Sequence, residues 1–301
     1  NVPAKKGVAN AKKVLHWMNR PDIPVYLGEE LPLVRPYVDA MDTHGEDGLG
    51  ESNYPEITNQ IMDESGVEFL THTLKNAAQT NDPVSIIALG PLTNLAKVIQ
   101  EDPQSLAGLG ELISMGGSYQ SHGNCSPVAE YNYWCDPHAA EIVYRAFEDL
   151  PVCQDKKIHM VGLDVTRKIV LTPNILEYMC YVNPQIGERI RKITRFYFDF
   201  HWKQEGVIGC VINDPLAVAY FVDRTLCSGI DACTRIATDG LCIGQSVVDG
   251  FDFWHGHKNS HVLTKNFSSG IYAECFFDRV LGVHPKVSCS VLEQIMKGDS
   301  Q

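Results

Sequence analysis

The amino-acid sequence predicts an α/β protein whose doubly wound, mostly parallel sheet is covered by flanking helices. Two observations favour this fold class. Short apolar runs alternate with helix-like segments along the chain, which is the pattern of parallel strands joined by crossover helices. Several of these runs are also followed by a helix that begins at a proline. A closed eight-fold barrel is the second possibility, but too few strand–helix units are visible for it.

The N-terminal part begins with a helical pattern and continues into a long connection. Apolar residues recur on one face of the stretch 5–18, and a short strand is expected at 23–28. Residues 31–55 are rich in Asp, Gly, Glu and Pro, and loops of this length inside compact domains are usually functional or disordered. The next helix begins after Ser65, which is predicted to form a capping box with Glu68.

Three strand–helix units are expected in the middle of the chain. The predicted strands are 85–89, 111–115 and 158–163. The helices that follow them are predicted at 91–99, 137–148 and 173–181. Each of these helices begins at a proline, a residue whose fixed φ suits the first helical position.

The C-terminal part contains both helices and strands. A long helix is expected over 186–200 and stops at Gly206. A further apolar strand and a proline-initiated helix follow in 209–221. Residues 233–265 alternate enough to be rich in β-structure, and 271–281 form a last amphipathic helix before a frayed tail, KGDSQ.

Composition excludes several classes of partner. The net charge of −12 and the pI near 5.3 argue against nucleic acid or an anionic membrane surface as a partner. No apolar run approaches the roughly 20 residues of a membrane span, and no signal peptide is visible. The ten cysteines contain no C-x-x-C pair, so we expect reduced thiols in a cytoplasmic protein. The whole chain, 1–301, is expected to form a single domain.

The histidines of the stretch 255–261 give two interpretations. His255, His257 and His261 fall within seven residues, which suggests a metal site. An exposed polar tract is the interpretation that we favour. Glycine-rich phosphate-binding motifs and the G-x-S-x-G motif of serine hydrolases are absent from the sequence.

The stretch 123–140 concentrates candidate ligand-binding side chains. Asn124, Glu130 and Asn132 lie within nine positions, after the predicted strand 111–115. Loops that leave the carboxyl ends of parallel strands are where open α/β sheets bind ligands. Because amides and carboxylates pair with vicinal hydroxyls, the pattern indicates a site for a sugar or polyol. The structural alternative is that Glu130 and Asn132 merely cap and solvate the loop.

Five motifs, in order along the chain, resemble the calcium-dependent nucleoside hydrolases, the inosine-uridine-preferring family. They are ALGPLTNLA (88–96), SMGGSY (114–119), GNCSPVAEYNYWCDPHAA (123–140), VGLDVT (161–166) and NDPLAVAYFVD (213–223). The resemblance spans essentially the whole chain. It implies a Rossmann-like α/β fold and hydrolysis of the N-glycosidic bond of ribonucleosides to free base and ribose.

The resemblance also implies a cofactor and an assembly. A Ca²⁺ ion at the carboxyl edge of the sheet is expected to hold the ribose hydroxyls and the nucleophilic water, with an aspartate as the base. Hard cations of this kind take oxygen ligands, which sugar diols supply. A homodimer or homotetramer is expected, because family members are usually dimers or tetramers.

Individual residues acquire roles from the same resemblance. The implied ribose-binding residues are Asn1, Met115, Asn124, Glu130 and Asn132. The implied calcium ligands are Asp214 and the backbone carbonyl of Leu89. The base-side candidates are His44, implied by the motif HGEDG, together with His201, Trp202 and Gln204 at the end of the long helix. From the residues alone, Asp214 can equally be a helix N-cap, and His201 can simply meet the helix dipole.

The sequence departs from the family pattern in two places. The family's aspartate cluster, D-x-D-x-x-x-D-D, is not contained in residues 1–301, so we expect this chain to lack the first strand and most calcium carboxylates. Asn213 stands where many members have a histidine, proposed to protonate the departing purine. Asn has no titratable proton, so another base-side group acts or protonation matters less.

Three hypotheses about function follow. The first is a ribonucleoside hydrolase, with pyrimidine nucleosides as the favoured substrates. The second is a catalytically silent relative that binds nucleosides or ribose. The third is a hydrolase of a related N-riboside outside the common nucleosides, which a panel of substrates would identify.

Overall fold

The computed structural model describes residues 1–57, 62–266 and 271–299, and it confirms the α/β class. Within these residues the main sheet has the strand order β1-β2-β3-β8-β6-β7. Its strands are β1 (Val84–Ala88), β2 (Leu109–Met115), β3 (Ile158–Val161), β6 (Cys227–Ile236), β7 (Ser246–Asp249) and β8 (Ser260–Asn266). The first four in the spatial order are parallel, whereas β6 and β7 pair antiparallel.

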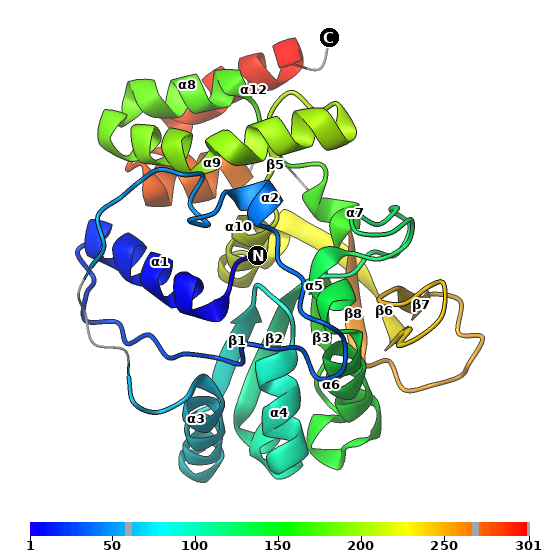
Figure 1. Ribbon diagram of the computed structural model, residues 1–301. Coiled ribbons are helices and arrows are strands. Elements are labelled where there is room, and N and C mark those ends of the chain that lie inside the picture. Colours follow the sequence, from blue (N-terminus) through cyan, green and yellow to red (C-terminus); the bar gives the residue numbers. More distant parts are fainter. Residues whose placement is uncertain (58–61, 267–270, 300–301) are drawn as a thin grey trace.

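Helices cover both faces of this sheet (Figure 1). On one face lie α3 (Gly66–Thr80), α4 (Thr93–Glu101) and α6 (Pro137–Asp149), which share a core with Leu112 and Val262. On the other face, Ile113 and Leu263 join a core with four helical segments. These segments are α8 (Pro173–Val182), α10 (Asp214–Val222), the π-helix Ile271–Val280 and α12 (Pro285–Asp299). Successive residues of a strand point to opposite faces, so each strand contributes to both cores.

The remaining elements are short, apart from two helices. These two helices are α1 (Ala4–Trp17) and α9 (Pro184–Glu205). The short α-helices are α2 (Met41–His44), α5 (Tyr131–Cys135) and α7 (Leu163–Thr166). The 3₁₀ turns are Pro103–Gly108, Pro151–Cys153 and Arg224–Leu226. A small antiparallel pair, β4 (Val170–Leu171) and β5 (Cys210–Val211), stands apart from the main sheet.

Several predicted helix starts are confirmed by their capping bonds. Ser65 and Glu68 form the complete capping box of α3, with both reciprocal hydrogen bonds present. Asp136 caps α6 by accepting a hydrogen bond from the backbone N–H of Ala139. Thr172 caps α8 in the same way. Local side-chain chemistry therefore determines where these helices begin.

Three predictions differ from the structure. The expected strand 23–28 is irregular: the carbonyl of Leu27 accepts from the backbone N–H of Gly66, and the next residue after the segment, Glu29, donates to Asn94, so no ladder forms. The strand expected near residue 209 is the short β5, which pairs with β4 outside the main sheet. Apolar composition cannot specify a partner strand, and a strand without one does not form. At the C-terminal end, the helix at 271–281 is not the last one as expected, because α12 follows it and continues to Asp299, inside the tail predicted to fray from 297; residues 300 and 301 lie outside the described part.

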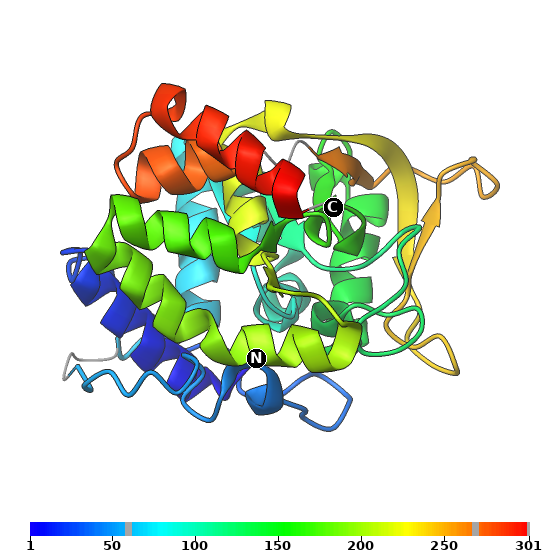
Figure 2. The same ribbon diagram turned by 90° about the horizontal axis from the view of Figure 1, so that it is seen from above.

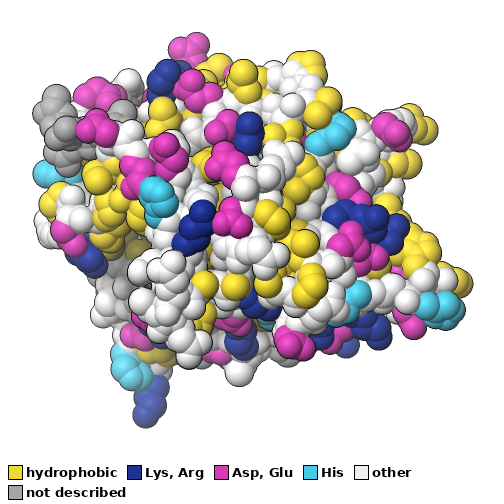
Figure 3. Space-filling model, turned by 90° about the horizontal axis from the view of Figure 1, so that it is seen from below, with side chains coloured by type: hydrophobic (Ala, Val, Ile, Leu, Met, Phe, Trp, Pro, Cys, Tyr) yellow, Lys and Arg dark blue, Asp and Glu magenta, His cyan; other side chains and the backbone are white. Residues whose placement is uncertain are grey.

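Helix α9 covers one end of the main sheet (Figure 2). Seen from above, α9 crosses over the carboxyl ends of the parallel strands, with α2 and residue 1 beside it (Figure 2). On the opposite side of the molecule, acidic and basic side chains are interspersed (Figure 3). No helix of the described ranges is both long enough and apolar enough to traverse a lipid bilayer. The space under α9 is therefore the place to look for a site at the strand ends.

Candidate active site

A cavity of about 390 Å³ lies between the carboxyl ends of β1 and β2 and the helices α2 and α9. It brings together nearly all of the site residues predicted from the sequence. Those that line it are Asn1, His44, Leu89, Met115, Asn124, Glu130, Asn132, His201, Gln204, Asn213 and Asp214. Trp202 is the exception; it lies on α9 with 60% of its surface exposed and does not line the cavity.

Glu130 is the buried centre of the loop between β2 and α5. Its carboxylate accepts hydrogen bonds from the backbone N–H groups of Asn132 at 2.8 Å, Gly117 at 2.9 Å and Tyr133 at 3.2 Å. The residue is only 2% exposed, and burial raises the pKa of its carboxyl to about 7 although the three N–H groups lower it. Glu130 is thus both the N-cap of α5 and a lining residue of the cavity.

Asn132 and Asn124 complete the polar wall on this side. The amide nitrogen of Asn132 donates to the backbone carbonyl of Met115 at 2.9 Å and, at 3.5 Å, to that of Leu89. The amide oxygen of Asn124 accepts from the backbone N–H of Tyr131 at 2.9 Å. These bonds hold the ends of β1, β2 and the loop in one arrangement before any ligand binds.

Asp214 lies opposite this wall, at the first turn of α10. Burial raises the pKa of its carboxyl to about 6. Asn213 precedes it but does not cap the helix with its side chain. Instead, the amide nitrogen of Asn213 donates to the hydroxyl of Tyr197 at 3.0 Å. Its amide oxygen is buried and has no hydrogen-bond partner within the described ranges.

The end of the cavity next to α9 contains a cluster of rings around Tyr197. The Tyr197 ring lies 4.9 Å from the His44 ring and 4.3 Å from the His201 ring, centroid to centroid. The backbone carbonyl of Tyr197 is 3.0 Å from Nδ1 of His201. Burial lowers the pKa of His44 to about 4 and also lowers the pKa of His201, so both imidazoles are neutral at neutral pH.

Sequence reasoning missed Tyr197 and Phe200 as cavity residues. Both line the cavity together with His201 and Gln204. The spacing in the sequence indicates this arrangement. Tyr197, Phe200 and Gln204 are three or four positions apart, and residues at this spacing lie on one face of a helix.

Arg167 is a third residue that the sequence did not single out. Its guanidinium donates to the carbonyl oxygens of His122 at 2.6 Å and Gly123 at 3.0 Å, and to the carboxylate of Glu205 at 3.1 Å. Glu205 is the last residue of α9, and Gly123 directly precedes Asn124. Arg167 therefore ties the loop that carries Asn124 to the end of α9, and both line the cavity.

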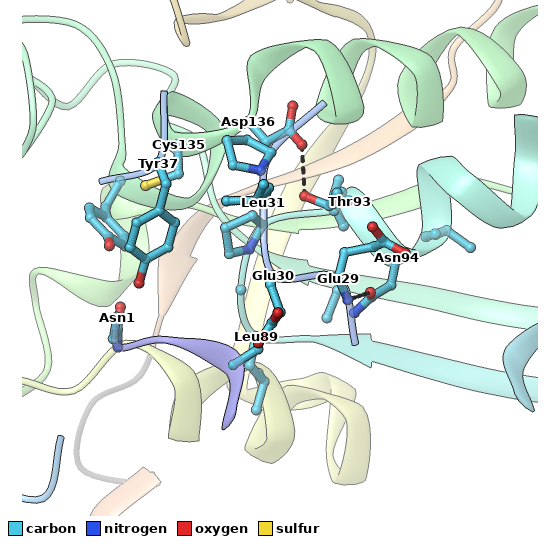
Figure 4. Close-up of a pocket in the computed structure, with 18 of the residues that line it drawn as sticks. Asn1, Glu29, Glu30, Leu31, Tyr37, Leu89, Thr93, Asn94, Cys135 and Asp136 are labelled. Atoms are coloured by element: carbon cyan, nitrogen blue, oxygen red, sulfur yellow. Dashed lines mark hydrogen bonds between the residues drawn. The ribbon is translucent and has the colours of Figure 1, made fainter. Parts of the chain in front are cut away.

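A second cavity, of about 400 Å³, adjoins the first along the outer side of β1. Figure 4 shows its polar side chains engaged with one another: Thr93 donates to Asp136 at 2.7 Å, and Asn94 accepts from the backbone N–H of Glu29 at 2.7 Å. Asn124, Glu130 and Asn132 do not line it. We therefore place the candidate active site in the first cavity.

The predicted metal ligands do not form a closed set. In the ranges 1–57, 62–266 and 271–299, no group of three or more His, Cys, Asp or Glu is placed to hold a metal ion. The histidines at 255–261 belong to the described residues and form no such group. His261 pairs with Asp231 at 2.7 Å, while His255 is exposed near Asp252. Calcium takes about 6–8 oxygen ligands, and Asp214 with the Leu89 carbonyl does not supply them.

Comparisons with known proteins agree on one family. The family model described as inosine-uridine preferring nucleoside hydrolase matches residues 1–270. Uridine nucleosidase 1 of Arabidopsis thaliana is 30% identical over 85% of this chain and 74% of its own length. The pyrimidine-specific ribonucleoside hydrolase RihA of Salmonella typhi is 31% identical over 87% of this chain and 81% of its own.

Solved structures give the same result for the fold. The purine-preferring ribonucleoside hydrolase from Gardnerella vaginalis superposes with a TM-score of 0.83 at 26% identity, covering 95% of this chain and 88% of that one. The plant nucleoside hydrolase PpNRh1 superposes with a TM-score of 0.81 at 26% identity, covering 90% and 84%. The fold class predicted from the sequence is confirmed.

Proposed function

The chain belongs to the inosine-uridine preferring nucleoside hydrolases, enzymes that hydrolyse ribonucleosides, and we propose that its reaction takes place in the cavity under α9. One observation carries this placement. The buried carboxylate of Glu130, the amide of Asn132 and the carboxylate of Asp214 line one cavity at the strand ends. The family relationship favours a hydrolase over a relative that only binds nucleosides.

We propose that the sugar occupies the wall formed by the loop after β2. Asn124, Glu130 and Asn132 would contact the ribose hydroxyls, with Met115 and Asn1 beside them. The support is that hydroxyls need both donors and acceptors, which amides and carboxylates provide together. Because the backbone N–H groups around Glu130 already hold its carboxylate, the wall needs little rearrangement when it binds the sugar.

We propose that the base lies against α9. His44, His201, Gln204 and Asn213 all line the cavity. Trp202 is proposed as an outer contact at the end of α9, since its side chain is exposed. A pyrimidine is the proposed base, because Asn213 offers no proton for a purine leaving group. Relatives named as uridine- and pyrimidine-specific support this choice.

The calcium ion that the sequence resemblance implies does not fit the described residues by themselves. Asp214 and the carbonyl of Leu89 are proposed as two of its ligands, but these oxygens are too few for the ion. No reaction step is assigned to calcium from this arrangement. Measuring bound metal in the purified protein, with and without a chelator, tests whether an ion is present.

We propose a cytoplasmic homodimer or homotetramer. The support is the family relationship for the assembly, and ten unpaired cysteines with no C-x-x-C pair for the cytoplasmic location. Analytical ultracentrifugation measures the assembly directly. A monomer at all concentrations would reject the proposal.

The function is tested by measuring the release of free base from a panel of ribosides. The panel contains uridine, cytidine, inosine, adenosine and a riboside outside the common nucleosides, each with calcium and with a chelator. Faster turnover of uridine and cytidine than of the purine nucleosides is expected. Binding without hydrolysis of any member would identify a silent nucleoside-binding protein instead.

A further inference from the structure

A third cavity, of about 550 Å³, lies between the end of α1, residues 54–57 and the start of α9. The helices α1 and α9 lie side by side at this place (Figure 2). No described residue lines both this cavity and the candidate active site. Arg189 in the third cavity and Gln204 in the candidate active site are 15 positions apart on α9, which separates them by about 22 Å along the helix axis.

Two aromatic rings form one side of the third cavity. Trp17 is the last residue of α1, and Tyr54 belongs to the connection that follows α2. Their ring centroids are 4.2 Å apart, and the ring planes are inclined by 56°. Both side chains are half-buried and line the cavity, so part of each ring faces the open space. Ring faces of this kind bind planar groups by stacking.

Two cationic side chains of α9 lie beside these rings. The guanidinium carbon of Arg189 is 5.5 Å from the centroid of the Trp17 ring, and one of its nitrogens donates to the Trp17 carbonyl at 3.4 Å. One turn further along α9, the ammonium nitrogen of Lys192 is 5.7 Å from the centroid of the Tyr54 ring. Within the described ranges, neither cation is paired with a carboxylate. Most of the five N–H groups of Arg189 are therefore left for a ligand.

The third cavity differs in charge from the candidate active site. No Asp or Glu is among the described residues that line it, although the chain as a whole has a net charge of −12. The candidate active site has one guanidinium, that of Arg167, and five carboxylates, which belong to Asp39, Asp42, Glu130, Glu205 and Asp214. An anion is therefore attracted to the third cavity and repelled by the candidate active site.

We propose that the third cavity binds an anionic ligand that carries a planar ring, of which a nucleoside 5′-monophosphate is an example. The ring stacks on Trp17 and Tyr54, and the phosphate pairs with Arg189. A guanidinium suits both contacts, because it binds phosphate or carboxylate through two parallel hydrogen bonds and also packs against aromatic faces. The inference goes beyond the proposed function and does not depend on it, since the two cavities share no residue.

The first experiment measures binding to the unaltered protein by isothermal titration calorimetry with three probes. Uridine 5′-monophosphate carries a ring and a phosphate, ribose 5-phosphate carries the phosphate without the ring, and 4-hydroxybenzoate carries a ring with a carboxylate. At least one of the two probes that contain a ring is expected to bind about 10-fold or more tightly than ribose 5-phosphate, because of stacking. The tighter of these two probes shows whether the anion is a phosphate or a carboxylate.

The second experiment repeats the titrations with variants of the cavity. Arg189→Gln removes the charge but keeps an amide that can donate a hydrogen bond, and it is expected to weaken binding of the tighter probe by about 10-fold or more. Trp17→Leu is expected to weaken the probes that contain a ring and to leave ribose 5-phosphate unchanged. Thermal melting establishes that each variant is folded. If Trp17→Leu does not fold, Tyr54→Leu removes the other ring instead.

Arg195→Gln is the matched control. Arg195 lies on the same helix but lines neither cavity, so the variant has the same change of net charge and should bind every probe as the unaltered protein does. Equal affinities in Arg189→Gln and Arg195→Gln would overturn the proposal, as would the absence of binding of both probes that contain a ring. Hydrolysis of ribosides is not part of this test, so a failure of the proposed function is distinguishable from a failure of the inference.

Discussion

The carboxylate of Glu130 accepts a hydrogen bond from the backbone N–H of Gly117 at 2.9 Å, which joins the end of β2 to the start of α5. Gly117 has φ of +75°, and a side chain there would also collide with Tyr133 and Ser246. The glycine lets the chain turn at the strand end, and Glu130 holds the turn. The wall of the cavity that we propose to bind the sugar depends on this pair.

Replacing Glu130 with Gln is expected to destabilise the protein and to weaken substrate binding. An amide NH₂ cannot accept from the N–H groups that the carboxylate now satisfies, so at least one buried donor is left unpaired, at a cost of about 1–3 kcal/mol. The free energy of unfolding in urea and the KM for uridine measure the two effects.

The matched control for this variant is Glu141→Gln. Glu141 accepts from the backbone N–H of Ile236 but does not line the cavity, so KM should not change. An unaltered unfolding free energy in Glu130→Gln would contradict the role given to the carboxylate.

Replacing Arg167 with Lys is expected to raise KM by roughly 10-fold while the melting temperature falls only slightly. Lysine keeps the charge, but it lacks the fork that reaches two loop carbonyls and Glu205 together. The loop before Asn124 would then be held less firmly against α9. Steady-state kinetics with uridine and thermal melting measure the two quantities.

Arg145→Lys provides the comparison for Arg167→Lys. Arg145 forms an ion pair with Glu148 on α6, and neither residue lines the cavity. Its KM should equal that of the unaltered protein. If both variants behaved alike, the proposed tie between loop and helix would be unsupported.

Replacing Asn213 with His is expected to introduce a pH-dependent activity on purine nucleosides. A histidine here would supply the titratable proton that Asn213 lacks, and general acids of this kind commonly accelerate reactions by about 10²–10⁴-fold. The ratio of inosine to uridine turnover should rise by about 10-fold or more, with a new decline of the rate at high pH. A ratio unchanged across the pH range would show that residue 213 does not control the leaving group.

His159, far from the cavity, is expected to make stability depend on pH. Burial, and then the charge of Arg224, lower the pKa of this imidazole from 6.5 to about 4. Between these values the unfolded chain binds a proton that the folded chain does not, so this contribution to stability is complete above pH 6.5 and is lost as the pH falls toward 4.

The variant His159→Asn should flatten the pH dependence of the unfolding free energy in that window. Each pKa unit of difference corresponds to about 1.4 kcal/mol. A slope in His159→Asn that equals the slope of the unaltered protein would reject the role of His159.

The strands and the helix starts were largely predictable because they depend on neighbours in the chain. Ser65, Asp136 and Thr172 cap their own helices. The apolar runs at 85–89 and 111–115 form β1 and β2, which pair with each other in the sheet. The segment 23–28 shows the limit of this reasoning. It has strand composition, yet it lies beside Gly66 and Asn94 without a ladder, since pairing depends on distant parts of the chain.

The sequence by itself determined the fold class and nearly all members of the candidate site, since the motifs around Asn124, Glu130 and Asp214 stand at predicted strand and helix ends. Only the tertiary structure decided how they interact. Tyr197 is 16 positions from Asn213, and Glu205 is 38 from Arg167, yet each pair is hydrogen-bonded. Burial, which sets the pKa values of Glu130 and His44, likewise exists only after packing, because it depends on the atoms that exclude water from each group.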